Sequence, residues 1–151
     1  MTINIPGRGP CTWETVVLDF NGTLATDGKV GLSVETLLHE VGLRYTTILA
    51  TADTFGTATY FAHRLGIRLE VVQTGRNKKD LVAGLSGGVV AIGNGANDQE
   101  MFRAADLAIA IVGPEGAAVP SLLAADIWVS STADALELLL HPDRLVATLR
   151  E

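Results

Sequence analysis

The chain has 151 residues, a formal net charge of −6, 48% hydrophobic residues and 19% charged residues. This length is typical of one domain, and the apolar fraction is large enough for one full core. The acidic balance argues against general nucleic-acid binding, which needs clustered Lys and Arg.

Cysteine content and hydropathy predict a cellular setting. The only cysteine is Cys11, so an internal disulfide is excluded. No uninterrupted apolar run approaches the roughly 18 residues of a membrane span. Residues 1–9 lack the apolar segment of a signal peptide. We therefore expect a cytoplasmic protein with no membrane partner.

Short apolar runs alternate with helical segments along the chain. Strands are predicted at 16–20, 46–50, 69–72, 89–92, 107–111 and 127–129. Helices are predicted at 33–40, 54–65, 78–85, 98–104, 117–124, 132–140 and 142–149, with Ser33 as an N-cap and Pro142 at a first helical position. This alternation predicts an α/β fold with a doubly wound, mostly parallel sheet, in one domain over residues 1–151. Residues 3–5 and 12–13 can pair as an N-terminal β-hairpin.

The most informative segment is Asp19-Phe20-Asn21-Gly22-Thr23-Leu24, which directly follows an apolar run. Ligands of open α/β sheets bind beyond the carboxyl ends of the strands, so Asp19 is a candidate reactive group. Three further polar groups occur at similar places: Thr51-Ala52-Asp53, Lys78-Lys79 and Gly93-Asn94-Gly95-Ala96-Asn97-Asp98. Parallel strands share one carboxyl edge, so all four groups are expected to converge.

This set of groups suits phosphoryl transfer. Asp19 can act as a nucleophile that forms an aspartyl-phosphate. Thr51 and Lys78 can hold the phosphoryl oxygens. Carboxylates in the first and last groups can bind Mg²⁺, a cation that prefers oxygen ligands.

The four groups resemble the four motifs of the haloacid dehalogenase (HAD) superfamily and, within it, those of the phosphorylation domain of P-type ATPases. Thr51-Ala52-Asp53 is similar to the T-G-D loop of these ATPases, Lys78 with Val82 and Leu85 to their K-x-x-x-V-x-x-L segment, and 93–98 to their G-D-G-x-N-D. The resemblance runs essentially end to end. It implies a Mg²⁺-dependent phosphohydrolase with Asp19, Asn21, Thr51 and Lys78 as catalytic residues and Asp19, Asn21, Asn94 and Asp98 around the metal, where Asn21 contributes its backbone carbonyl.

Two positions depart from the family pattern. Phosphatases of the family have a general acid/base Asp two residues after the nucleophile, where this chain has Asn21. Loss of such a group costs about 10²–10⁴ in rate, so slow turnover is expected. Asn94 stands where the family has a metal-binding Asp, so weaker Mg²⁺ binding is expected.

The spacing between motifs bounds the substrate. The segments 19–51 and 51–78 are too short to hold an inserted cap domain. The site is therefore expected to be open, either for a bulky phosphorylated substrate or for cover by a second subunit, with a homo-oligomer as one form of such cover.

Structural roles compete with chemical ones at several positions. Asp53 is more simply explained as the N-cap of the following helix than as a catalytic group. Lys78 is preferred to Lys79 because its spacing to Val82 and Leu85 matches the motif. A second function also stays open: a catalytically weak module that uses the same pocket to bind a phosphate ligand or a regulatory partner.

Overall fold

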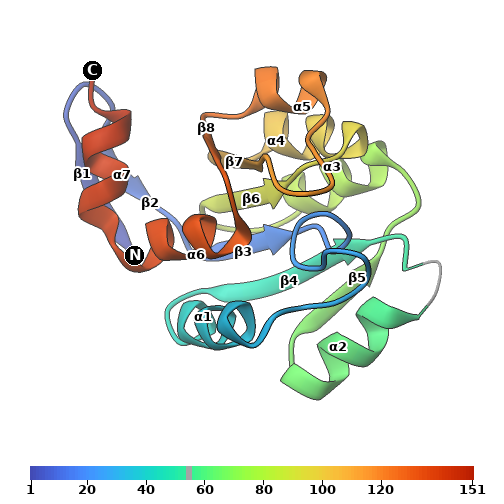
Figure 1. Cartoon of the computed structure of the whole chain (residues 1–151). Coiled ribbons are helices and arrows are strands. Elements are labelled where there is room, and N and C mark those ends of the chain that lie inside the picture. The colour runs from blue at the N-terminus through green and yellow to red at the C-terminus, as the bar shows by residue number, and fades with distance from the viewer. Residues whose placement is uncertain (54–55) are drawn as a thin grey trace.

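The computed structural model describes residues 1–53 and 56–151, and its central feature is a parallel β-sheet (Figure 1). The sheet has six strands in the order β5-β4-β3-β6-β7-β8, and every neighbouring pair is parallel. The strands are β3 (Thr15–Leu18), β4 (Thr46–Thr51), β5 (Arg68–Val71), β6 (Val89–Gly93), β7 (Leu107–Ile111) and β8 (Ile127–Val129). The predicted doubly wound α/β fold is confirmed.

The central strands are apolar on both faces because helices cover both sides of the sheet. All residues of β3, β6 and β7 are buried, as expected for a sheet with no solvent-exposed face. Alternate residues of β3 enter two separate cores. Val16 and Leu18 face one core, and Val17 faces the other.

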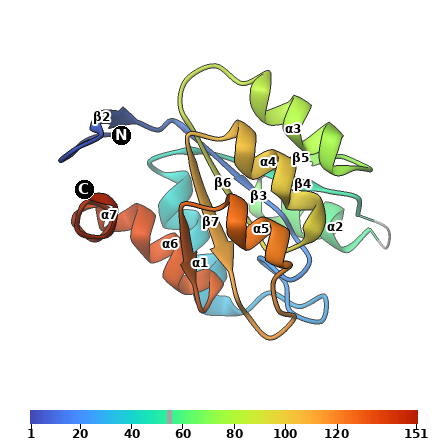
Figure 2. The ribbon, with the colours of Figure 1, turned by 90° about the horizontal axis from the view of Figure 1, so that it is seen from above.

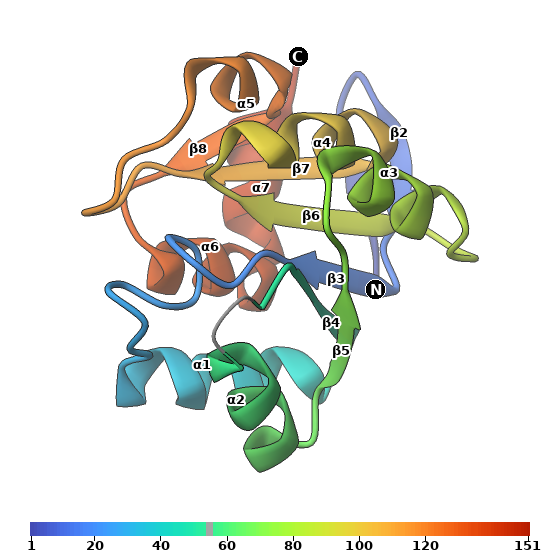
Figure 3. The ribbon, with the colours of Figure 1, turned by 90° about the vertical axis from the view of Figure 1, so that its right-hand side faces the viewer.

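The helices form two layers, one on each face of the sheet (Figures 2 and 3). The core of Val16 and Leu18 includes residues of α1 (Leu32–Gly42), α2 (Thr57–Leu65), α6 (Thr132–Leu140) and α7 (Pro142–Leu149). The core of Val17 includes residues of α3 (Gly75–Ala83) and α4 (Gln99–Ala104), with residues of α5 (Val119–Ala124) packed against it. A short 3₁₀ helix, η1 (Ala96–Asp98), precedes α4.

The order of the strands places a topological switch at β3. From β3 the chain moves outward through β4 and β5, then returns to the other side of β3 and continues through β6, β7 and β8. Open α/β sheets bind ligands at such a reversal, outside the carboxyl ends of the strands. The end of β3, just before Asp19, is therefore the expected place for a site.

A β-hairpin and the C-terminal helix pack together at one end of the molecule (Figure 1). Strands β1 (Thr2–Ile5) and β2 (Gly9–Thr12) are antiparallel, which confirms the predicted hairpin, although Trp13 lies beyond it. The Glu151 backbone N–H donates to the Pro6 carbonyl at 3.2 Å, and Arg8 contacts the Glu151 carboxylate at 3.5 Å. Both chain ends are thereby held at the hairpin.

Several predicted helix starts were wrong, and local capping explains why. Helix α1 begins at Leu32 after Gly31, so Ser33 lies inside the first turn and is not its N-cap. Helix α3 begins at Gly75, because the Thr74 hydroxyl accepts the Asn77 N–H at 3.2 Å. The predicted start of α2 at 54 lies outside the described residues. Pro142 does occupy the first turn of α7, as predicted.

The segments between the motifs are short. Residues 21–31, here called the flap, lead from β3 toward α1, and the described part of the chain has no inserted cap domain there. Among the described residues, no helix combines the length and hydropathy required to cross a bilayer.

Candidate active site

Asp19 lies one residue beyond β3, at the topological switch. Its backbone N–H donates to the Ile92 carbonyl at 2.9 Å, which continues the pairing of β3 with β6 by one residue. The side chain of Asp19 is buried. The sheet therefore places a buried carboxylate at its carboxyl edge.

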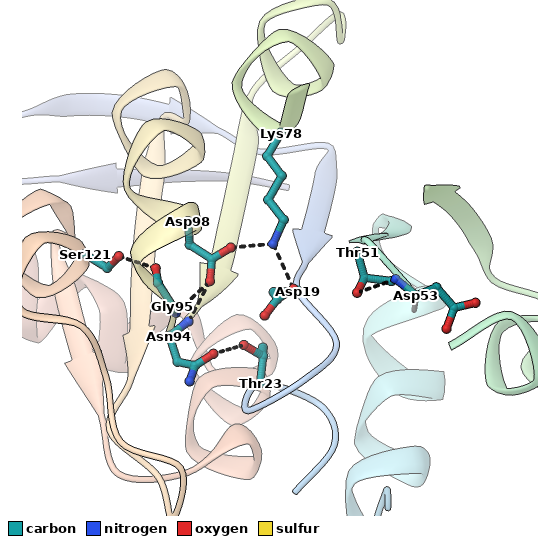
Figure 4. A network of polar contacts seen from close by, with 9 residues as sticks. All are labelled: Asp19, Thr23, Thr51, Asp53, Lys78, Asn94, Gly95, Asp98 and Ser121. Carbon is teal, nitrogen blue, oxygen red and sulfur yellow. Dashed lines mark hydrogen bonds and ion pairs between the residues drawn. The ribbon is translucent and has the colours of Figure 1, made fainter. Parts of the chain in front are cut away.

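Lys78 joins Asp19 to Asp98 (Figure 4). Its ammonium nitrogen lies 2.8 Å from Asp19 Oδ1 and 2.6 Å from Asp98 Oδ1, and Lys78 is 1% exposed. The neighbouring Lys79 has a side chain that is 50% exposed and lies 3.8 Å from Glu100. Lys78 lies one turn inside α3, so its long side chain reaches down to the strand ends.

Two carboxylates share this one ammonium, and burial together with the neighbouring charges shifts the pKa of Asp19. Burial raises the pKa of Asp19 to about 6, the charge of Asp98 acts in the same direction, and Lys78 opposes both. Burial alone would lower the pKa of Lys78, but Asp19 and Asp98 outweigh it, so the pKa of the ammonium is raised. Lys78 stays charged at neutral pH, and the cluster holds one more negative charge than positive when both acids are ionised.

Asp98 organises the loop that follows β6. Its Oδ2 accepts the backbone N–H groups of Asn94 and Gly95, each at 2.9 Å, while its Oδ1 accepts from Lys78. A Cβ at Gly93 would lie 2.4 Å from Asp98 Oδ2, so glycine is required for this approach. Both oxygens of Asp98 are therefore already hydrogen-bonded within the protein.

Asn94 links three segments of the site. Its Oδ1 accepts from the Thr23 hydroxyl at 3.3 Å, and its Nδ2 donates to the Gly116 carbonyl at 3.0 Å. Its backbone carbonyl accepts the Ala118 N–H at 2.8 Å. Gly22 adopts a positive φ of 74° beside the amide, and a Cβ there would lie 2.4 Å from Asn94 Nδ2.

Thr51 and Asp53 occupy the end of β4, on the other side of Asp19 from Asp98 (Figure 4). Thr51 is buried, and its hydroxyl accepts the Asp53 N–H at 3.4 Å. The Asp53 carboxylate accepts the N–H groups of Ala58 and Thr59 at 2.8 and 3.0 Å. Asp53 thus caps the first turn of α2, as predicted, although Gly56 holds the formal N-cap position.

Asn21 is exposed at the start of the flap. Among the described residues, no backbone N–H of a turn, loop or cap donates to the Asn21 carbonyl. The preceding Phe20 carbonyl, in contrast, accepts two such hydrogen bonds. The Asn21 carbonyl is therefore available as an oxygen ligand. In the described part of the chain, no three His, Cys, Asp or Glu side chains form a group that could hold a metal ion.

Two cavities flank the flap. One, of about 370 Å³, lies between the flap, the 113–114 segment and the start of α6. The other, of about 400 Å³, lies between the flap and α2, and aromatic residues, Lys29 and Arg64 line it. Lys29 borders both cavities. Volumes in this range are typical of small-molecule sites.

The structure thus brings together three of the predicted residues, Asp19, Lys78 and Asp98, by direct contact. Asn94 is attached to them through the loop backbone. Thr51 lies beside them, and Asn21 is exposed two residues after Asp19. Sequence reasoning assigned no role to Gly116 or to the buried Ser121, whose hydroxyl donates to the Gly95 carbonyl. Gly116 and Ser121 lie more than 20 residues along the chain from their partners, Asn94 and Gly95. The only signal in the sequence for a partner of Asn94 was the position of Thr23 inside the first motif.

Comparison with known proteins identifies the fold. No protein-family model matches the chain. Solved structures that resemble it include 3-deoxy-D-manno-octulosonate 8-phosphate phosphatase from Moraxella catarrhalis, in complex with magnesium, phosphate and KDO (TM-score 0.72, 17% identity, 91% of this chain and 94% of that chain). The cobalt-bound deoxy-D-mannose-octulosonate 8-phosphate phosphatase from Haemophilus influenzae is similar too (TM-score 0.73, 14% identity, 92% of this chain and 94% of that chain).

A membrane transporter contains the same fold. A zinc-transporting PIB-type ATPase matches with a TM-score of 0.66 and 21% identity over 79% of this chain, which spans only 20% of the transporter.

An uncharacterized protein of Methanocaldococcus jannaschii, MJ0073, is 48% identical over 63 residues, which are 42% of this chain and 68% of that protein. The chain therefore belongs to the same family as MJ0073. The similar solved structures show that its fold is HAD-like.

Proposed function

We propose that this protein is a divalent-metal-dependent phosphohydrolase that works through an aspartyl-phosphate on Asp19. One observation carries the proposal: Asp19 and Asp98 share the buried ammonium of Lys78 at the topological switch of the sheet. The similar solved structures include phosphatases with bound metal, which supports the same chemistry here.

The reaction begins with a phosphate monoester beside Asp19. A carboxylate oxygen of Asp19 attacks phosphorus, and the bond from phosphorus to the leaving oxygen breaks. The leaving oxygen takes a proton from water, because Asn21 carries no acidic proton. Water then attacks phosphorus, and the bond from phosphorus to the Asp19 oxygen breaks, which releases inorganic phosphate and restores the Asp19 carboxylate. The proton lost by this water neutralises the hydroxide that formed when the leaving oxygen was protonated.

Lys78 and Thr51 have electrostatic roles in this scheme. The Lys78 ammonium lies against the nucleophile and is held in place by Asp98, so it is preorganised to balance charge on the phosphoryl oxygens. Thr51 lies at the neighbouring strand end with a buried hydroxyl, suited to donate to a phosphoryl oxygen.

The residues present fit a hard divalent cation. The Asp19 carboxylate and the Asn21 carbonyl are oxygen ligands, and the excess negative charge of the buried cluster favours a cation. Asn94 Oδ1 and Asp98 are further candidate ligands, although each already accepts hydrogen bonds. When bound, Mg²⁺ would neutralise charge on the phosphoryl group. Because Asp19 Oδ1 and both oxygens of Asp98 already accept hydrogen bonds, we expect weak affinity for the cation.

The amide at position 21 has a kinetic consequence. Neither the departure of the leaving group nor the attack of water receives help from an acid or base there, so turnover is slow. Substrates with good leaving groups, such as acyl phosphates or p-nitrophenyl phosphate, are turned over faster than alkyl phosphates. With no inserted cap in the described residues, a bulky substrate or a second subunit covers the site.

A second candidate function is a phosphate-binding or regulatory module with little catalysis. The observation in its favour is that Asn94 uses both ends of its amide for contacts within the protein, while Asn21 offers no acid or base. In this case the pocket binds a phosphate group but no phosphoenzyme forms.

Phosphoenzyme trapping distinguishes the two. The purified protein is incubated with radiolabelled acetyl phosphate and Mg²⁺, quenched in acid and then treated with hydroxylamine, which cleaves acyl phosphates. Phosphohydrolase function predicts a hydroxylamine-labile label that is absent in Asp19→Asn and retained in Asp80→Asn, an exposed carboxylate on α3. No label, together with saturable binding of inorganic phosphate, would favour the binding module.

A further inference from the structure

The Asn94 side chain is a junction between two surface segments that are far apart in the sequence. The Thr23 hydroxyl, in the flap, donates to Asn94 Oδ1 at 3.3 Å. The Gly116 carbonyl, in the 113–118 segment, accepts from Asn94 Nδ2 at 3.0 Å. Both segments border the same 370 Å³ cavity. The backbone of Asn94 also donates to Asp98, so the junction is anchored to the Lys78 cluster.

Only an amide satisfies both partners. A backbone carbonyl such as that of Gly116 can only accept, so the group facing it has to be a donor. Thr23 can donate to the remaining oxygen. A carboxylate at position 94 has no donor, and would set an anionic oxygen against the Gly116 carbonyl. The hydrogen bonds with Thr23 and Gly116 therefore explain why this chain carries Asn at position 94, where the family resemblance leads us to expect a carboxylate.

We propose that Asn94 is a positioning residue: its amide clamps the flap to the 113–118 segment and so sets the position of the flap, which begins two residues after Asp19. The clamp is buried, because Asn94 and Thr23 are 9% and 2% exposed. Gly22 fits against the amide with no room for a side chain. The Thr132 hydroxyl also holds the Thr23 carbonyl, so the flap is fixed at the residue that contacts Asn94.

The same two segments touch at a second point on the surface. The Asp27 N–H donates to Glu115 Oε1 at 2.8 Å, in an exposed contact. Water competes for exposed hydrogen bonds but not for buried ones, so removal of the buried link should have the larger effect. Glu115→Ala is therefore a matched control that breaks the outer contact alone.

The clamp is a property of the folded chain, and only its effect on turnover rests on the proposed function. The first readout is therefore hydrogen exchange in EDTA, measured by mass spectrometry on peptides that cover 20–31 and 112–119. We expect Asn94→Asp to speed exchange in both peptides by about tenfold, with no change in the central strands. Thr23→Val should affect the flap peptide alone, and Thr23→Ser, which keeps the hydroxyl, should restore protection.

The second readout is kinetic and uses acetyl phosphate with Mg²⁺. A loosened flap weakens substrate binding, so Thr23→Val should raise KM about fivefold and keep kcat within twofold. A merely structural defect would lower the fraction of competent protein, and hence kcat, with KM unchanged. Thr23→Ser should behave as the parent chain.

Three results would overturn the clamp. They are unchanged exchange in both peptides of Asn94→Asp, an increase spread evenly over the sheet, and an effect of Glu115→Ala as large as that of Asn94→Asp. If acetyl phosphate is not turned over at all, the proposed function fails while the exchange result still decides the clamp.

Discussion

Neutralisation of Asp19 should stabilise the metal-free protein, and the gain should grow with pH. Burial raises the pKa of Asp19 to about 6 from the ordinary carboxyl value of 3.8. The folded state therefore binds more protons than the unfolded state between these two values, and the free energy of unfolding falls as pH rises through this window. The gap corresponds to about 3 kcal/mol. Asp19→Asn mimics the protonated acid and removes this loss.

The size of the effect can be worked out as a difference between two pH values. At pH 7 the free energy of unfolding of the variant should exceed that of the parent chain by about 3 kcal/mol, and at pH 4 by less than about 1 kcal/mol, because the unfolded carboxyl is then only partly ionised. Urea unfolding in EDTA measures both, with the fluorescence of the buried Trp13 as the probe. The exposed Asp80→Asn should show no such trend. A difference that stays flat with pH, or a variant less stable at pH 7, would refute the burial argument.

Three further changes test the site. Lys78→Met leaves two buried carboxylates without their cation, so the free energy of unfolding at pH 7 should fall by about 3–5 kcal/mol. Lys79→Met is the control: its side chain is half-exposed, so the free energy of unfolding should change by less than about 0.5 kcal/mol. Asn21→Asp should speed dephosphorylation in single-turnover experiments by about 10²-fold; an unchanged rate would show that the chemistry does not use position 21. Asn94→Asp should tighten Mg²⁺ binding in calorimetry, because a full charge is added to the loop, and equal affinity would count against Asn94 as a ligand.

The convergence of the motifs could be predicted because it follows from topology. Asp19, Thr51 and the 93–98 loop each come directly after an apolar run, and parallel strands share a carboxyl edge. The bounds of the six strands in the parallel sheet were accordingly right to within two residues. Asp53 could also be placed, since an acid just before a helix commonly caps it, and its carboxylate does accept two N–H groups of α2.

Helix starts and long-range contacts were harder to predict. Thr74 and Asn77 resemble a capping box, but Gly75 and Arg76 between them did not indicate a helix. Lys78 was therefore expected at the start of α3, whereas it lies one turn inside the helix. The contact of Asn94 with Gly116 joins residues 22 positions apart. No local sequence pattern predicts this contact, because Asn94 donates to a backbone carbonyl, and every residue of the chain has one.

Two positions of the site, 21 and 94, carry an amide where an acid was expected, and the two amides should affect different properties of the protein. Asn21 is exposed, and its side chain bears on proton transfer, so its replacement by Asp should act on rate and leave the folded state almost unchanged. Asn94 is buried and makes two hydrogen bonds, so its replacement by Asp should act on flap order and metal affinity. If both variants are combined and the effects arise from different steps, the rate gain of Asn21→Asp should persist in the Asn94→Asp background at saturating Mg²⁺. Loss of that gain would show that the flap held by Asn94 is what presents position 21 to the phosphoryl group.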